Sequence, residues 1–319
     1  MSTVVFHRNF QSFQGGHLKV FHYFEHVRSS PSHDARVRFS PDSVWDSSNP
    51  WSRSRETVIG PGQDAHADVL FLAGMDWRAL APEQRAASPL PIVNLIQGVR
   101  HARASEPVHE FLVHPAIRIC VSAEIQDALE SLGTVEGPIF TIPIGIDLEG
   151  LPAARPAEER DIDCVVLAVK DPPLGRSIAR RLSKAGYRVL LVDRPIPRDE
   201  LLGAMARARV SVHLPVLAEG AYMPALESMA LGTLVVCPDC VGNRSFCRDG
   251  ETCLMPERSE EAIVEAAMLA LSASAQELEP MLARARAESM ARGLAPERNR
   301  FLEILDAVED LWAARRVGP

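Results

Sequence analysis

The chain has 319 residues, of which 46% are hydrophobic, and this length is enough for two domains of ordinary size. A formal net charge of −8 argues against a protein that gains its affinity by neutralising the phosphates of a nucleic acid. We therefore expect a small-molecule ligand and no nucleic-acid partner.

We expect neither a membrane-spanning segment nor a secretory leader. No run of apolar residues reaches the length of a transmembrane helix, and the start MSTVVFHRNF has neither a basic region nor a long apolar region. We expect a cytoplasmic protein without a transmembrane segment, for which a peripheral contact with a membrane stays open.

The first half alternates short β-rich runs with helical patterns, which predicts a parallel sheet covered by helices. The segment 40–61 is rich in Ser, Pro, Asp and Trp and predicts a long surface loop, in which Trp45 and Trp51 either stack on an acceptor molecule or pack the loop down. The predicted strands are 3–7, 68–72, 92–96 and 117–121, and the predicted helix is 16–27.

The second half repeats the alternation after a linker rich in Pro, Ala and charge at 151–160, which predicts a second Rossmann-like domain. The tail has apolar residues at Phe301, Leu305, Val308 and Trp312, which form one stripe on a helix. The predicted strands are 163–169, 188–192, 210–214 and 233–237, and the predicted helices are 177–185, 199–208 and 224–231.

Two residue classes raise the question of a metal site. Cys237, Cys240, Cys247 and Cys253 have a spacing that is tighter between pairs than in zinc ribbons, so buried free thiols are the preferred interpretation. All histidines except His213 lie in the first 114 residues, and none has the HExxH spacing of a metal site. We expect no bound metal.

The stretch EGAYMPALESMALG, residues 219–232, carries the most chemical information. Pro224 suits the first turn of a helix, and Gly232 suits the residue just after its end. The free N–H groups of this helix would point out of the carboxyl edge of a parallel sheet, where doubly wound folds bind ligands. An anion such as a pyrophosphate fits there.

Glu219 and Glu227 lie on either side of this helix start. A carboxylate can accept both hydrogens of a vicinal diol, so the two side chains suit sugar hydroxyls better than phosphate. The alternative is that Glu227 only complements the helix dipole while Glu219 is solvated.

The segment from Glu219 to Pro256 resembles the donor-binding segment of family 4-like glycosyltransferases of the GT-B fold, whose pattern is E-G-aromatic-G-x-P-x-L-E-A-M-A-x-G. Weaker similarity covers the Gly15–Gly16 pair and the phrase IPIGID at 142–147. The resemblance implies two Rossmann-like domains that face each other across a cleft, with a last helix that crosses back to the first domain. We assign 1–148 to the acceptor side, 149–298 to the nucleotide sugar and 299–319 to that helix.

The resemblance also implies roles for single residues. Glu219 would face the donor sugar, and Glu227 would hold the ribose hydroxyls. Lys170 and Arg176 would neutralise the pyrophosphate, although their order is reversed relative to the family, and Arg176 could instead be a surface charge. The segment near sugar and phosphate comprises Gly220, Ala221, Tyr222, Met223 and Pro224.

Two positions in the first domain complete the set. Gln97 stands where many family members have a histidine, and it can donate to a sugar hydroxyl but cannot act as a base. It could equally stabilise its loop, and His101 nearby is a second candidate for a sugar contact. Gly16 would let a phosphate or an acceptor approach the backbone.

The resemblance implies a retaining, metal-independent, hexosyltransferase-like enzyme of glycan biosynthesis that needs no cofactor beyond its nucleotide diphosphate sugar. The acceptor would be a glycan, a lipid-linked sugar or a small molecule. Two other functions stay open: a nucleotide-sugar hydrolase or epimerase that uses Glu219 and Glu227 as a catalytic pair, and a non-catalytic subunit that binds sugar nucleotides.

Overall fold

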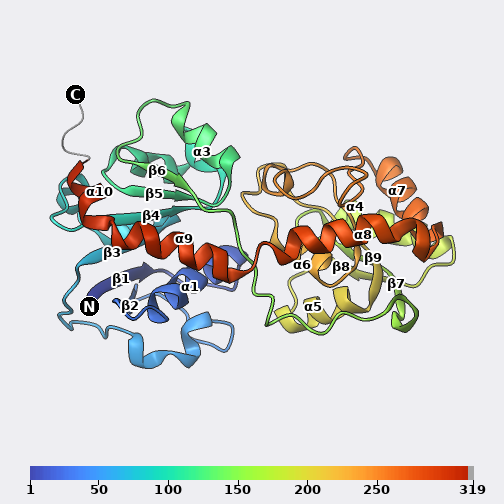
Figure 1. Ribbon diagram of the computed structural model, residues 1–319, viewed down its shortest axis with the longest axis horizontal. Helices are drawn as coiled ribbons and strands as arrows, with labels where there is room; N and C mark the ends of the chain where they lie inside the picture. Colours follow the sequence, from blue (N-terminus) through green and yellow to red (C-terminus); the bar gives the residue numbers. More distant parts are fainter. Residues whose placement is uncertain (315–319) are drawn as a thin grey trace. The chain divides into compact units, whose positions relative to one another are not determined.

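The computed structural model describes residues 1–314, which form two compact α/β units. The first unit comprises Met1–Ile144 and the chain from Ala295, and the second comprises Gly145–Leu294 (Figure 1). The sequence predicts the boundaries between these parts of the chain after residues 148 and 298. Each unit has one parallel sheet with helices packed on it, as the alternation of strands and helices predicts.

The sheet of the first unit has six strands in the order β2-β1-β3-β4-β5-β6, and each strand is parallel to its neighbours. The central strand β4 reads IVNLI and is buried along its whole length, as expected for a strand covered on both faces. The strands are β1 (Ser2–Arg8), β2 (His33–Phe39), β3 (Val69–Ala73), β4 (Ile92–Ile96), β5 (Ile117–Cys120) and β6 (Ile139–Thr141).

The helices of the first unit include two that come from the end of the chain. Phe301, Leu305, Val308 and Trp312 are all buried, so the apolar stripe does pack, but the chain divides into two helices between Asp306 and Val308. The expected end of this segment at residue 319 lies outside the described residues. The helices are α1 (Gly15–Arg28), α2 (Pro82–Ala86), α3 (Ala123–Glu130), α9 (Leu294–Asp306) and α10 (Val308–Ala314).

A buried ion pair fastens α9 to α1. Lys19 Nζ donates to both carboxylate oxygens of Glu297, at 3.0 and 2.8 Å, and both side chains are almost fully buried. His26 Nε2 lies 2.9 Å from the same carboxylate. Phe301 adds an edge-to-face contact with Tyr23 at a centroid distance of 4.7 Å. These contacts make the end of the chain part of the first unit.

The sheet of the second unit has four strands in the order β10-β9-β7-β8. Its strands are β7 (Ile162–Leu167), β8 (Val189–Val192), β9 (Ala208–His213) and β10 (Leu234–Val236). Its helices are α4 (Pro172–Lys184), α5 (Arg198–Arg207), α6 (Met223–Ala230), α7 (Glu260–Ser272) and α8 (Ala275–Met290). Short 3-10 turns lie at Pro50–Arg53, Arg55–Thr57, Gly74–Ala79, Val99–Ala102, Pro107–Val113, Ala157–Glu159 and Val241–Asn243.

The segment 40–61 contains two of these turns. Residues 41–48 are mostly exposed, as expected for a surface loop, and buried side chains recur from Asn49 onward. Trp51 is fully buried against Phe21, Phe24 and Phe39, so it serves the core and cannot stack on an acceptor. Trp45 is partly exposed and contacts Phe39 at a centroid distance of 4.6 Å. Packing is therefore the role of Trp51.

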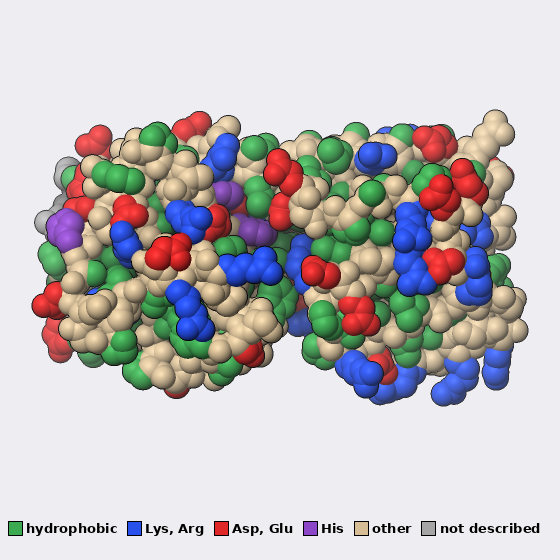
Figure 2. All heavy atoms as spheres, turned by 90° about the horizontal axis from the view of Figure 1, so that it is seen from below, with side chains coloured by type: hydrophobic (Ala, Val, Ile, Leu, Met, Phe, Trp, Pro, Cys, Tyr) green, Lys and Arg blue, Asp and Glu red, His purple; other side chains and the backbone are tan. Residues whose placement is uncertain are grey.

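The described part of the molecule gives no sign of a membrane span, because within residues 1–314 no helix is both long enough and apolar enough to cross one. On the face shown in Figure 2, basic side chains occur in small groups interrupted by acidic ones. This distribution agrees with a net negative charge that does not favour nucleic acid.

A pH dependence of stability follows from His101, which is buried with Nδ1 at 2.9 Å from the Gly98 carbonyl oxygen. Burial lowers the pKa of His101 to about 4. The unfolded chain therefore binds a proton below about pH 6.5 that the folded chain does not, so stability falls as the pH decreases. Between pH 7 and pH 5 this group alone should cost about 2 kcal/mol.

The measurement is urea unfolding of wild type and His101→Gln at pH 7 and pH 5. All four tryptophans lie in the first unit, so their fluorescence reports the unit that contains His101. We expect His101→Gln to lose less stability on acidification, whereas His66→Gln, which alters an exposed histidine, should behave as wild type. An unchanged pH dependence in His101→Gln would contradict the assignment.

Candidate functional site

The candidate site lies at the carboxyl edge of the second sheet, where β7 and β9 are neighbours although β8 separates them in sequence. Such a topological switch point is where open α/β sheets bind ligands. A pocket of about 160 Å³ opens there. Its walls are mostly apolar, and its lining residues are Leu167, Val169, Lys170, Val192, Pro195, Ile196, Leu201, Leu214, Tyr222 and Pro224.

The helix α6 presents an open N-terminus at this edge. Its N-cap residue Tyr222 makes no side-chain capping bond. Pro224 has no N–H, and the Ala225 amide donates to the Tyr222 carbonyl oxygen at 3.3 Å, so the Met223 amide is the first-turn donor left for an anion. The neighbouring helix α4 differs, because the Asp171 side chain accepts from the Leu174 amide and closes its first turn. Of these two helix ends, that of α6 is the better anion site.

Glu227 lies in the second turn of α6 and is only 1% exposed. Arg198 Nη2, at the start of α5, donates to its Oε1 at 2.6 Å. The other oxygen, Oε2, is buried and has no hydrogen-bond partner among the described residues. A buried carboxylate oxygen without a partner is costly, so this atom is suited to accept a hydrogen bond from a ligand hydroxyl.

Glu219 lies in the loop that follows β9, and its side chain is 21% exposed. Its Oε1 is 3.7 Å from Lys170 Nζ, which is at ion-pair distance but too long for a hydrogen bond. The same oxygen is buried and makes no hydrogen bond within residues 1–314. Lys170 lines the pocket, so the structure brings this cation and this carboxylate together at its edge.

Gly242 packs directly against the backbone between the two glutamates. The Tyr222 amide donates to the Gly242 carbonyl oxygen at 3.1 Å. A Cβ on Gly242 would lie 2.6 Å from the Ala221 nitrogen and 2.8 Å from the carbonyl carbon of Gly220, so only glycine fits. The Tyr222 ring packs edge-to-face on the buried His213 at a centroid distance of 5.6 Å. The loop 219–222 is thus held in place by residues that do not line the pocket.

Arg176, the predicted partner of Lys170, lies in the second turn of α4 and does not line the pocket. Its Nη1 donates to Asp193 Oδ2 at 2.8 Å, and its side chain is half exposed. This ion pair occupies the guanidinium and agrees with the surface-charge alternative. Its predicted contact with a pyrophosphate stays a prediction.

The remaining predicted residues lie in the first unit. Gln97 Nε2 donates to the Gly16 carbonyl oxygen at 3.3 Å, so these two residues, far apart in sequence, are neighbours. This contact is the loop-stabilising role that the sequence left open for Gln97. His101 is buried and turned toward Gly98, which disfavours a sugar contact.

Arg198 is the site residue that sequence reasoning missed. It stands in an ordinary helix start, IPRDELL, and its partner Glu227 is 29 residues away. A possible signal was available: the buried position of Glu227 on a short apolar helix requires a cation from elsewhere in the fold.

The cysteines show no arrangement for a metal. All six are buried free thiols. Within residues 1–314, no group of three or more His, Cys, Asp or Glu side chains is placed to hold an ion.

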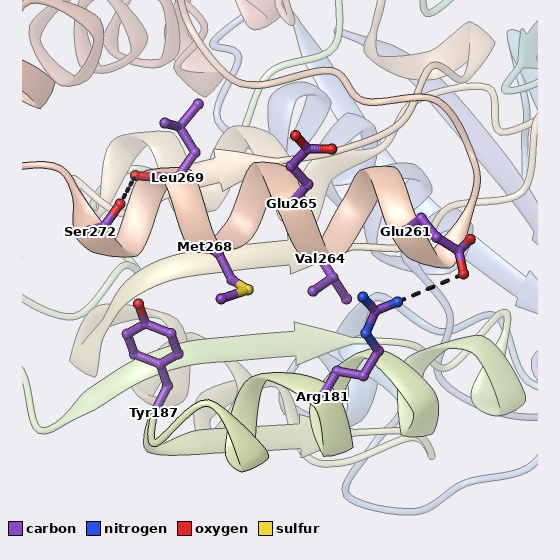
Figure 3. A pocket seen from close by; sticks show the side chains of 8 residues that line it. All are labelled: Arg181, Tyr187, Glu261, Val264, Glu265, Met268, Leu269 and Ser272. Carbon is purple, nitrogen blue, oxygen red and sulfur yellow. Dashed lines mark hydrogen bonds and ion pairs between the residues drawn. The ribbon is translucent and has the colours of Figure 1, made fainter.

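A larger hollow of about 560 Å³ lies on the outer helices α4 and α7, away from the carboxyl edge of the sheet (Figure 3). Arg181 forms an ion pair with Glu261 at 3.8 Å across it, and Val264 and Met268 face its floor. None of the predicted site residues lines this hollow. We therefore place the candidate site at the smaller pocket.

Comparison with known proteins locates a family in the second unit. Residues 148–273 match the family glycosyl transferases group 1. This match lies within the second unit. No curated protein has significant similarity to the chain.

Solved structures with the GT-B fold resemble the whole chain. HepE from Anabaena in complex with UDP has a TM-score of 0.73 at 13% identity and covers 96% of this chain and 100% of its own. Sucrose-phosphate synthase from Thermosynechococcus elongatus has a TM-score of 0.69 at 14% identity, and the match covers 98% of this chain and 100% of the synthase chain. The UDP-forming trehalose-phosphate synthase from Burkholderia xenovorans has a TM-score of 0.66 at 12% identity, and the match covers 97% of this chain and 100% of the synthase chain. The chain thus has the GT-B fold that the motif predicts.

Gly242→Ala tests how the second unit holds the loop 219–222. The new methyl group would collide with the backbone of Ala221, and overpacking of this kind costs about 1–3 kcal/mol. We expect the hydrogen bond of the Tyr222 amide to break and its hydrogen exchange to accelerate. Gly203→Ala is the matched control, since a Cβ there meets nothing within 4 Å. Unchanged exchange at Tyr222 in Gly242→Ala would show that the loop does not depend on this contact.

Proposed function

We propose that the protein is a glycosyltransferase that moves a sugar from a nucleoside diphosphate sugar to an acceptor hydroxyl. The observation that carries the proposal is the buried Glu227, which is fixed by Arg198 through one oxygen and has its other oxygen unpartnered. A ribose hydroxyl is the group that would satisfy this oxygen. The family of the second unit and the GT-B fold support the same activity.

The parts of a nucleotide sugar match the parts of the site. The apolar pocket beside Ile196 and Leu201 suits the flat face of a base, and the open N-terminus of α6 suits the diphosphate. HepE, which shares the fold, was crystallised with UDP and with UDP-glucose, and this supports a nucleoside diphosphate sugar as donor. The base and the sugar are not fixed by any side chain that we can name.

In the proposed reaction, the bond between the anomeric carbon and the diphosphate oxygen breaks, and its electron pair leaves with the diphosphate. A new bond forms between the same carbon and the acceptor oxygen, and the hydroxyl proton passes to the leaving phosphate. Lys170 and the Met223 amide at the start of α6 would stabilise the developing negative charge, and Glu219 would stabilise the positive charge on the sugar. We propose retention of configuration and no metal, with an acceptor bound by the first unit.

The contacts of the two glutamates do not favour the alternative of a hydrolase in which they form a catalytic pair. Glu227 is almost fully buried and already bonded to Arg198, so it is poorly placed to activate water. Transfer is therefore the function we prefer. A role in glycan biosynthesis, a cytoplasmic location and any peripheral membrane contact stay predictions.

Substitutions of the two glutamates should affect different quantities, the affinity for UDP in one case and kcat in the other. Glu227→Ala removes a contact present in both ground and transition states, so it should weaken UDP binding by about tenfold or more. Glu219→Ala should leave UDP binding nearly unchanged and reduce kcat on the order of 100-fold, because its contact matters most in the transition state. Calorimetric titration with UDP and steady-state kinetics with a UDP-sugar measure the two effects.

Glu261→Ala on the outer hollow is the control and should match wild type in both measurements. Normal UDP binding by both site variants would reject the ribose contact. Normal turnover by both would reject their part in the reaction.

Metal independence is tested with a chelator. We expect turnover of the UDP-sugar to survive excess EDTA. Lys170 and the Met223 amide of α6 would stabilise the negative charge of the leaving diphosphate, which a divalent cation stabilises in metal-dependent transferases. Complete loss of activity with EDTA, restored by magnesium or manganese, would contradict this.

A further inference from the structure

A buried polar cluster lies behind the candidate site, where β9, α5 and α6 are neighbours (Figure 1). It contains His213, which is the last residue of β9, together with Ser211 of the same strand and Ser228 of α6. All three residues are 0% exposed. None of them lines the pocket, and the proposed reaction uses none of them. Polar side chains in a core are costly unless they bond to one another, so their contacts indicate what the cluster does.

His213 contacts α6 at two places. Its Nε2 lies 3.2 Å from Ser228 Oγ, in the second turn of the helix, and 3.0 Å from Ser211 Oγ. Its ring packs edge-to-face on the ring of Tyr222, the N-cap residue, at a centroid distance of 5.6 Å. The first turn of α6 and Glu227 lie between these two contacts.

Both residues that contact His213 on α6 depart from the pattern E-G-aromatic-G-x-P-x-L-E-A-M-A-x-G. Tyr222 stands at the position of its second glycine, and Ser228 stands at the position of its first alanine. A glycine and an alanine at these positions would offer His213 neither a ring nor a hydroxyl group. Two of the three departures in the segment 219–232 are therefore linked by one buried histidine, and the third is Ala221.

The partners of His213 determine its tautomer. Burial lowers the pKa of His213 to about 3, so the ring is neutral and carries one proton. Ser228 Oγ donates to Met205 Sδ at 3.0 Å, so toward His213 this hydroxyl group can only accept. Nδ1 is buried without a hydrogen-bond partner within residues 1–314, and a proton there would be an unsatisfied buried donor. The proton is therefore on Nε2, between the two hydroxyl oxygens.

Ser228 also connects the cluster to the ion pair of the site. Met205, which accepts from Ser228, lies on α5, and Arg198 at the start of the same helix donates to Glu227. Glu227 and Ser228 are consecutive residues of α6, so the bonds from Arg198 and His213 hold adjacent positions of one helix turn. A rotation of α6 that turned Glu227 away from the ligand would have to break the bond from His213.

We propose that His213 is a positioning residue for nucleotide binding. Its Nε2–H holds Ser228, and through Ser228 it keeps the adjacent Glu227 in the orientation that presents the unpartnered Oε2 to a ribose hydroxyl. This role rests on the proposed nucleotide contact of Glu227, but it does not require sugar transfer. Because Glu227 would contact the nucleotide in ground and transition states alike, the loss of this bond should change the affinity for UDP and not kcat.

Three substitutions isolate the hydrogen bond. His213→Phe keeps a ring beside Tyr222 but removes the donor, so UDP affinity should fall about fivefold while kcat stays within about twofold of wild type. Ser228→Ala removes the acceptor and should lower UDP affinity by the same factor. His213→Gln keeps a donor near the position of Nε2 and should retain UDP affinity within about twofold.

The combined variant and a matched control separate positioning from general stability. His213→Phe with Ser228→Ala should bind UDP no more weakly than either single variant, because both changes remove the same bond. Val210→Ala is the control: Val210 lies in the same strand but belongs to the core cluster that contains Ile263 and Ala267 of α7. The cavity that it creates should lower the urea midpoint of unfolding and leave UDP affinity within about twofold.

Calorimetric titration with UDP, steady-state kinetics with a UDP-sugar and the nitrogen resonances of the His213 ring in the full chain give the readouts. We expect a neutral ring that is protonated on Nε2. A proton on Nδ1, unchanged UDP affinity in His213→Phe and Ser228→Ala, additive losses in the combined variant, or an equal loss in Val210→Ala would each overturn the proposal. The expected differences in UDP affinity in a protein without transfer activity would instead reject the proposed transfer alone.

Discussion

The hydrogen bond from Arg198 to Glu227 is the interaction on which the rest of the site depends. It gives the Glu227 carboxylate, which is 1% exposed on a short apolar helix, a cationic partner at 2.6 Å. Because Arg198 takes only one oxygen, the other is oriented and unpartnered. The fold thus maintains an acceptor atom on α6, the helix whose start lines the apolar pocket.

The two units solve the same problem with different chemistry. Each has a parallel sheet whose order places the first and third strands of the unit side by side, which opens a switch point at the carboxyl edge. In the second unit this edge combines Glu219, Glu227 and Lys170, a set that contains acceptors for hydroxyl groups. In the first unit it carries Arg8, which donates to the buried Asp76 carboxylate and contacts the His17 ring.

Local sequence patterns predict the elements in which the apolar residues coincide with the buried positions. β4 begins and ends where its apolar run does, and α6 is displaced by a single residue from 224–231. β2, with the sequence HDARVRF, was missed because alternating charged residues mark a half-buried strand less clearly than an apolar run. α8 was missed as well, and it contains Pro280, which usually argues against a helix interior. Contacts such as that of Arg198 with Glu227 join distant segments, so no spacing in the sequence can reveal them.

The most direct test of this account is hydrogen exchange with and without UDP. If the carboxyl edge of the second sheet holds the nucleotide, protection should appear in residues 192–202 and 214–227, which contain most of the pocket lining and both glutamates. The outer hollow on α4 and α7 should show no change. Protection of α7 around Glu261 and Met268, with residues 214–227 unaffected, would contradict the assignment of the site.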